Sequence, residues 1–242
     1  MKWILSISLV WVSLVSMGQH SHSTWDALLK KHVSSKGVVD YAGFKKDEKV
    51  LDGYLAHLSQ REPQASASND EQLAYWINAY NAFTIKLVLT HLDKKLTSIK
   101  DIGSKFQVPF VNTPWDVKFI KIAGKEMDLN AIEHGIIRKK FDDPRIHFAL
   151  VCAAVSCPPL RAEAFVAKQL DKQLDDQGIR FLNDPTKNLV KSDKAVVSKL
   201  FTWYGGDFKN TMNWINKYSK IQITSKTKIT YMDYNWALNG SY

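Results

Sequence analysis

The chain has 242 residues, of which 45% are apolar and eight are tryptophan. This much apolar material can build a buried core, which excludes an intrinsically disordered chain. The formal net charge is +9. Because the lysines are scattered along the chain in short groups, we interpret them mainly as a solvated surface that attracts anionic cell-envelope ligands weakly.

The N-terminus has the features of a secretory signal. Lys2 precedes an apolar run over residues 3–15, and small residues follow at positions 16 and 18. This pattern predicts a signal peptide over residues 1–18 and cleavage before Gln19, with a retained N-terminal anchor as the alternative. We therefore expect an exported protein, periplasmic or secreted, for which nucleic acid is not a partner. No later apolar run reaches the roughly 20 residues that a membrane-spanning helix needs, so no transmembrane span is expected in the mature chain.

The first half of the mature chain is predicted to be mainly helical. Helices are expected over residues 25–32, 44–58 and 70–92, with an extended piece at 37–41. The segment 70–92 begins with capping residues and is apolar on nearly all sides, so it is predicted to be the central buried helix.

The second half mixes both kinds of element. Strands are predicted at 115–122 (followed by a turn at 123–125), 146–151, near 189 and 196, at 221–224 and at 228–231, and helices at 129–140, 162–183 and 207–218. Short strands interleaved with helices predict an α+β fold, with helices packed around a small mixed or antiparallel sheet. We expect residues 19–242 to form a single domain, with its core at about 70–210.

The segment 145–161 is the most informative part of the chain. The predicted strand 146–151 carries His147 and leads into a loop that holds both cysteines and ends at Pro158. Cys157 is a candidate nucleophile if a nearby cation, an imidazole or the N-terminus of a helix beginning at Pro158 stabilises its thiolate. Alternatively Cys157 is a small buried residue, or it forms a disulfide with Cys152, and the sequence leaves both possibilities open.

Two histidines are candidate bases for that thiol. His134 follows Glu133 on the predicted helix, where neighbouring side chains point about 100° apart but can border one cleft. His147 lies on the predicted strand, where a histidine is more often a core group than a base.

Two asparagines and three arginines complete the set of candidate residues. Asn78 and Asn81 share one face of the central helix, where each amide must find a partner or bind substrate. The arginines either bind an anionic ligand or pair with nearby carboxylates; they are Arg138, Arg145 and Arg161. The spacings typical of zinc sites are missing, so neither a metal nor another cofactor is expected.

Several segments, taken together and in order, resemble the family called domain of unknown function 547. They are VDY at 39–41, WINAYNA at 76–82, IEHGIIR at 132–138, RIHFALVC at 145–152, SCPPLR at 156–161, FTWY at 201–204 with DF at 207–208, and DYNWALN at 233–239. The resemblance implies the fold family, but the family name assigns no function. The Glu-His and Cys-Pro motifs are similar to those of cysteine hydrolases, which is an analogy. Residues 153–155 depart from the family pattern, where we expect a glycine and a more polar residue.

Two functions follow from these residues. The first is a cysteine-type hydrolase or acyl transferase acting on an amide or ester, with Cys157 as nucleophile, His134 or His147 as base, and Glu133 or Asn78 as orienting group. The alternative is a non-catalytic domain that binds a small-molecule or cell-envelope ligand. In that case Glu133, Arg138 and Arg145 supply the polar contacts, and Trp203 and Tyr204 supply the aromatic ones. The sequence assigns neither the substrate nor the oligomeric state.

Overall fold

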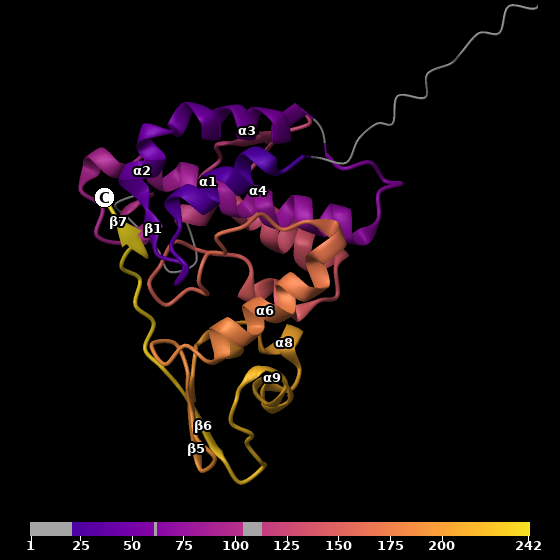
Figure 1. Ribbon diagram of the computed structural model, residues 1–242, viewed down its shortest axis with the longest axis vertical. Coiled ribbons are helices and arrows are strands. Elements are labelled where there is room, and N and C mark those ends of the chain that lie inside the picture. The colour runs from indigo at the N-terminus through magenta and orange to yellow at the C-terminus, as the bar shows by residue number, and fades with distance from the viewer. Residues whose placement is uncertain (1–20, 61, 104–112) are drawn as a thin grey trace, which may run out of the picture.

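The computed structural model describes residues 21–60, 62–103 and 113–242 (Figure 1). The predicted signal peptide and its cleavage point lie outside these residues. Within them, helices predominate and the strands form small sheets of two or three members, which confirms the predicted α+β class.

The helices have the following bounds in the described residues. The α-helices are α1 Ser23–His32, α2 Tyr41–Lys46, α3 Glu48–Gln60, α4 Asn69–Leu89, α5 Arg138–Lys140, α6 Leu170–Leu182, α7 Leu200–Trp203, α8 Gly205–Phe208 and α9 Thr211–Tyr218. The shorter helical segments are η1 Leu92–Lys94, η2 Ile99–Asp101, η3 Pro114–Asp116, η4 Ala131–Ile137, η5 Pro144–Phe148 and η6 Ala167–Gln169. All of these η segments are 3₁₀-helical except η4, which is a π-helix.

The strands lie in three separate groups. They are β1 Val39–Asp40, β2 Ile120–Ile122, β3 Lys125–Met127, β4 Leu189–Val190, β5 Lys194–Val197, β6 Lys228–Tyr231 and β7 Gly240–Ser241. β1 pairs with β7 in parallel, β2 and β3 form an antiparallel hairpin, and β5 lies between antiparallel β4 and parallel β6. The β1–β7 pair joins residue 39 to residue 240, so two segments that are far apart in the sequence lie side by side there.

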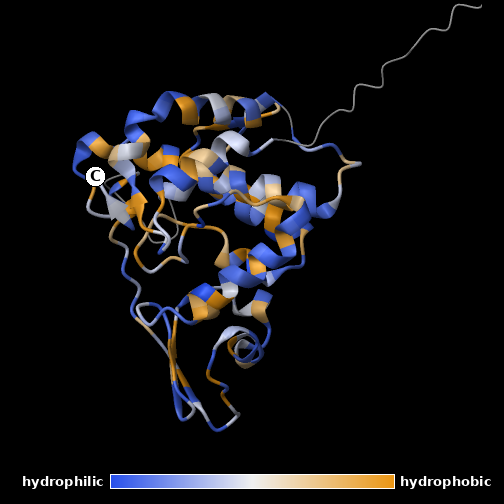
Figure 2. Ribbon diagram, in the orientation of Figure 1, coloured by the Kyte–Doolittle hydropathy of each residue, from blue (hydrophilic) through white to orange (hydrophobic). Residues whose placement is uncertain are grey.

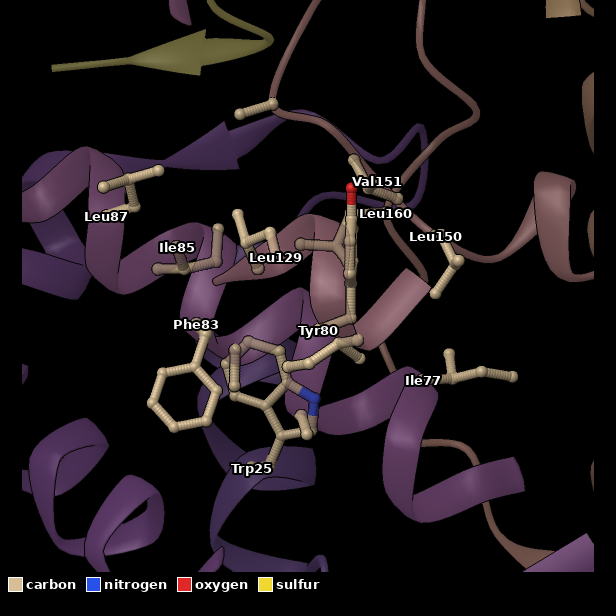
Figure 3. Close-up of a cluster of buried hydrophobic side chains, with 14 of the residues drawn as sticks. Trp25, Ile77, Tyr80, Phe83, Ile85, Leu87, Leu129, Leu150, Val151 and Leu160 are labelled. Carbon is tan, nitrogen blue, oxygen red and sulfur yellow. The ribbon is translucent and has the colours of Figure 1, made fainter. Parts of the chain in front are cut away.

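Helix α4 is the central buried helix that the sequence predicts. Ser68 caps it: its hydroxyl accepts from the Glu71 backbone N–H, and the Glu71 carboxylate accepts from the Ser68 N–H. Most of its 21 residues are buried. Figure 3 shows part of the surrounding cluster, in which side chains of α1 and α4 pack with Leu129, Leu150 and Leu160.

The core consists of two hydrophobic clusters. The larger one surrounds α4 and includes α1, α2 and α3 at the upper end of Figure 1. The smaller one is rich in aromatic rings and lies among α6, α8, α9 and the β5–β6 strands at the lower end. In Figure 2, α3 and α6 carry both hydrophilic and hydrophobic residues, as helices with one buried face do. Phe148 belongs to the smaller cluster and Ala149 to the larger, so the segment 146–151 connects them.

The prediction of a strand at 146–151 is wrong. Asp143 caps a 3₁₀-helix by accepting from the Arg145 N–H, and Pro144 occupies its first turn, where proline is well tolerated. The next residues form no strand either, because an asparagine side chain takes the place of a strand neighbour. The Asn81 amide donates to the Ala149 carbonyl and accepts from the Val151 N–H.

Other predicted elements are shorter than expected or are not formed. The helix at 162–183 begins only at Leu170, after η6, and the strand at 115–122 is reduced to β2 after η3. The region 129–140 is a π-helix followed by one α-helical turn, and 207–218 is divided between α8 and α9. Residues 221–224 form no strand, and no helix begins at Pro158. The turn at 123–125, the strands near 189 and 196 and the strand at 228–231 are confirmed.

Candidate functional site

Six polar side chains form one connected group, which we call the polar cluster. Its members are Glu133, His134, Arg138, His147, Tyr204 and Asp207. The first two lie on η4, whose Arg138 N–H bonds to the Glu133 carbonyl five residues earlier. Because π-helical turns are rare and occur frequently at functional sites, the conformation of η4 itself points to this region.

Glu133 is a buried carboxylate surrounded by tyrosine hydroxyls. The residue is 6% exposed, and the Tyr204 hydroxyl donates to it at 2.7 Å. Burial, together with the charge of Glu133, raises the pKa of Tyr204, Tyr80 and Tyr234. These phenols therefore keep their protons at neutral pH, so they can donate hydrogen bonds toward the carboxylate.

Asp207 joins the two sides of the cluster. Arg138 donates to both of its oxygens from Nε and Nη2, each at 2.7 Å, and this pairing lowers the pKa of Asp207 to about 2. His147 Nε2 lies 2.7 Å from the same carboxylate, and the imidazole stacks on the Tyr204 ring at a centroid distance of 3.7 Å. Burial lowers the pKa of His147. The imidazole is therefore neutral at pH 7 and its Nε2–H donates to Asp207.

His134 is the member of the cluster with an exposed side chain. That side chain is 43% exposed, and its Nδ1 lies 3.9 Å from the Glu133 carboxylate. Arg138 Nη1 lies 3.1 Å from Nδ1, and an arginine can only donate. This hydrogen bond assigns the proton of the neutral ring to Nε2, so His134 offers solvent a donor rather than a base.

The two cysteines form a disulfide, which settles the alternatives that the sequence leaves open. Cys157 is 2% exposed, whereas Cys152 is partly exposed. The Cys152 backbone N–H donates to Cys157 Sγ at 3.1 Å, and the Tyr234 hydroxyl lies 3.3 Å from both sulfurs. Burial and then the charge of Glu133 raise the pKa of Tyr234, so this tyrosine lies close to the polar cluster as well as to the disulfide.

The C-terminal segment holds the cysteine loop in place. The Val155 N–H donates to the Ala237 carbonyl and the Ser156 N–H to the Asn235 carbonyl. Lys187 Nζ donates to the Val155 carbonyl at 2.6 Å. The loop conformation is thus fixed by contacts on both of its sides.

The other predicted site residues lie outside the polar cluster. Asn78 donates to the Phe165 carbonyl and accepts from its N–H, and Asn81 binds the backbone at residues 149 and 151. Arg145 pairs with Asp143, Asp171 and Asp175. Arg161 pairs with Asp176 and Glu163. The structure therefore brings together Glu133, His134, His147 and Arg138, and it brings Cys157 to Tyr234.

Sequence reasoning missed Asp207, Tyr80 and Tyr234 and treated Tyr204 only as aromatic contact area. Asp207 is the single acidic residue in the segment 201–210 and stands three residues after Tyr204. That spacing places two residues on one side of a helical turn, which was the available signal. Nothing in the spacing of Tyr80 or Tyr234 pointed to Glu133.

An aromatic surface adjoins the cluster at Tyr234. Trp203 is 47% exposed and packs against Tyr234 and Trp236, with centroid distances of 4.7 and 5.7 Å. Trp115 meets the edge of Trp236, and the Lys100 ammonium lies 4.1 Å above that ring. We call the four rings Trp115, Trp203, Tyr234 and Trp236 the aromatic surface.

A separate pocket of about 830 Å³ opens beside the start of α1 and the residues that precede α4. It contains none of the predicted site residues. Its carboxylates already have partners within the protein: Asp26 pairs with Lys30, and Glu71 caps α4. We therefore place the candidate site at the polar cluster.

Among residues 21–60, 62–103 and 113–242, no three histidine, cysteine or acidic side chains are grouped so that they could hold a metal ion. Over the same residues, no helix combines the length and the hydropathy that crossing a bilayer requires.

Comparison with known protein families gives a match over the middle part of the chain. A family model described as "Protein of unknown function, DUF547" matches residues 64–182, a range that includes α4, η4 and the cysteine loop. No curated protein and no solved structure matches the chain.

Proposed function

Since the chain belongs to the DUF547 family, whose description assigns no activity, we propose a function from the site itself: a ligand-binding domain. It would recognise a small-molecule or cell-envelope ligand at the polar cluster and the aromatic surface. The Cys152–Cys157 disulfide is the observation that carries this proposal, because a bridged sulfur offers no thiolate nucleophile.

The exposed groups of the polar cluster and the aromatic surface are suited to recognition of a ligand. His134 offers an N–H donor, and Trp203 offers an aromatic face. Both are supported from behind, because Arg138 holds His134 and Tyr234 packs against Trp203. Groups that are already held lose little conformational freedom when a ligand binds, which favours affinity.

A thermal-shift screen of sugars, peptides and isolated cell-envelope polymers tests this proposal. We expect at least one of them to raise the melting temperature of the wild type, and the rise to be lost in His134→Ala and Trp203→Ala. Tyr231→Ala is the control, because Tyr231 is equally exposed at 45% but lies outside the aromatic surface, on β6. A ligand whose effect is unchanged in both site variants, or a screen without any ligand, would contradict the proposal.

A cysteine-type hydrolase or acyl transferase acting on an amide or ester is the second candidate. It is favoured by the two donors at Cys157 Sγ, because the same donors would stabilise a thiolate after reduction. It requires reduced protein to turn over esters or amides, iodoacetamide to stop the turnover, and Cys157→Ala to abolish it. Ligand binding that survives Cys157→Ser without turnover would instead support the binding domain.

A further inference from the structure

Beyond ligand binding, we propose that Cys152 and Cys157 form a redox-active pair that exchanges electrons with an external dithiol. Cys152 is the sulfur that an incoming thiolate attacks, and Cys157 is the sulfur that leaves. The proposal rests on the different surroundings of the two sulfurs and not on the ligand site.

Access to the two sulfurs is unequal. Cys157 is 2% exposed and belongs to the larger core cluster, so an external thiolate cannot reach it in the native fold. Cys152 is partly exposed and only packs against that cluster. Because the rate of thiol–disulfide exchange depends on which sulfur can be approached, attack is directed to Cys152.

The buried sulfur has a hydrogen-bond donor that the other sulfur lacks, and this favours Cys157 as the leaving group. Cys157 Sγ accepts from the Cys152 N–H at 3.1 Å, and the Tyr234 hydroxyl, which lies 3.3 Å from both sulfurs, can donate to it as well. Burial raises the pKa of Tyr234, so its hydroxyl remains a donor throughout the neutral range. Hydrogen bonds to a thiolate favour the charged form, and a thiolate that is stabilised in this way leaves faster.

The loop does not depend on the disulfide for its shape. The bridge spans a sequence separation of five residues, and such a short loop gains less from a cross-link than a long one. Hydrogen bonds from Val155 and Ser156 to the C-terminal segment, and from Lys187 to Val155, already fix the backbone. Reduction can therefore proceed while the surrounding fold persists.

The exchange balances in two steps. A donor thiolate attacks Cys152 Sγ, the bond between the cysteine sulfurs breaks, and Cys157 Sγ leaves with the electron pair. The second thiolate of the donor then attacks the donor sulfur in the mixed disulfide, and Cys152 Sγ leaves and takes up a proton from solvent. Two electrons have passed to the protein, and the donor remains as a disulfide.

Equilibration of the full mature chain in glutathione buffers of varied composition tests the proposal. Alkylation followed by mass spectrometry would give the reduced fraction at each cysteine, with no denaturant present before quenching. We expect native protein to be reduced in these buffers, and Tyr234→Phe to shift the equilibrium constant three- to tenfold toward the disulfide. The matched control, Tyr231→Phe, removes an exposed hydroxyl on β6 and should leave the constant unchanged.

The site of attack provides a second readout that does not depend on Tyr234. In Cys157→Ser, the remaining Cys152 should form a mixed disulfide with oxidised glutathione, whereas in Cys152→Ser the buried Cys157 should react at least tenfold more slowly. Reduction that occurs only on unfolding, an unchanged constant in folded Tyr234→Phe, or equal reaction of both cysteines would overturn the proposal. Ligand binding by the oxidised protein is measured separately, so either result leaves the proposed function to its own test.

Discussion

At the scale of single residues, Glu133 shows how a buried charge is maintained. Its carboxylate accepts from the Tyr204 hydroxyl, and an arginine and a histidine of the same cluster lie nearby. A buried acceptor that loses its donor costs about 1–3 kcal/mol, because its desolvation is no longer compensated.

Tyr204→Phe tests this dependence while keeping the ring that stacks on His147. We expect the free energy of unfolding, measured by urea titration, to fall by about 1–3 kcal/mol. Tyr231→Phe removes an exposed hydroxyl instead and should change it by less than about 0.5 kcal/mol. An equal change in the free energy of unfolding of both variants would mean that the Glu133–Tyr204 hydrogen bond does not contribute to stability.

The lowered pKa of Asp207 makes the free energy of unfolding depend on pH in the acid range. Arg138 lowers the pKa of Asp207 to about 2 in the folded protein, whereas an unfolded aspartate titrates near about 3.9. Because the folded value is the lower one, the contribution is present above the unfolded pKa and is lost as the pH falls through the folded one. Unfolding titrations from pH 5 to pH 2 should therefore show a smaller loss of stability in Asp207→Asn than in the wild type.

A carboxyl without such partners is the control for that comparison. Asp193 is exposed and lies before β5, so Asp193→Asn should keep the acid dependence of the wild type. An Asp207→Asn profile parallel to that of the wild type would show that the Arg138 pairing is unimportant for acid stability.

At the scale of elements, α4 acts as a support for two irregular segments. Asn78 makes two hydrogen bonds to the Phe165 backbone, and Asn81 makes two to the backbone at residues 149 and 151. Side-chain amides offer one acceptor and two donors, so each can replace the neighbour that a strand would otherwise provide. The helix thereby fixes the position of the segment that leads into the cysteine loop.

The variant Asn78→Ala distinguishes a structural role of Asn78 from a role in ligand binding. Loss of the amide leaves the buried Phe165 N–H and carbonyl without these partners, and each such group costs about 1–3 kcal/mol. We expect a corresponding fall in the free energy of unfolding, while the folded protein keeps the ligand affinity of the wild type. A large loss of affinity in folded protein would place Asn78 in the binding site instead.

The sequence predicted the elements that local pattern determines and failed where distant residues decide. The capped, apolar segment of α4 is predicted within a few residues because its signals are all local. The segment 146–151 has the composition of a strand, but Pro144 and the distant Asn81 impose another conformation. For the site, the sequence identified Glu133, His134 and His147, but the Asp207 that links two of them through Arg138 lies 60 residues beyond His147.

At the scale of the whole molecule, Phe148 links the two core clusters. It packs against Phe181, Phe201 and Phe208, while the next residue belongs to the cluster around α4. We propose that residues 19–242 unfold as a single domain. Phe148→Ala should lower the free energy of unfolding by about 3–5 kcal/mol and leave one transition.

Two spectroscopic probes can test whether both core clusters unfold together in one cooperative transition. Tryptophan fluorescence and far-ultraviolet circular dichroism should report the same midpoint in urea, in the wild type and in the variant. Separate midpoints would mean that the two clusters unfold independently.

We propose that the protein is exported, and its N-terminal residues allow this proposal to be tested. We expect the protein outside the cytoplasm to begin at Gln19, as intact-mass measurement would show. Charges in the apolar run, as in Leu9→Arg with Val10→Arg, should retain the full-length precursor inside the cell. Processing and release that persist in this variant would exclude the signal peptide.

The contact between the cysteine loop and residues 233–240 has a consequence for the order of events during synthesis. The loop leaves the ribosome about 80 residues before the segment that holds it, since translation proceeds from the N-terminus. Tyr234, Asn235 and Ala237 join the loop only when the chain is nearly complete. The thiols of a nascent chain are therefore open to oxidation or to wrong partners, and a ribosome that stops before residue 233 releases a protein whose cysteines lack their native cover.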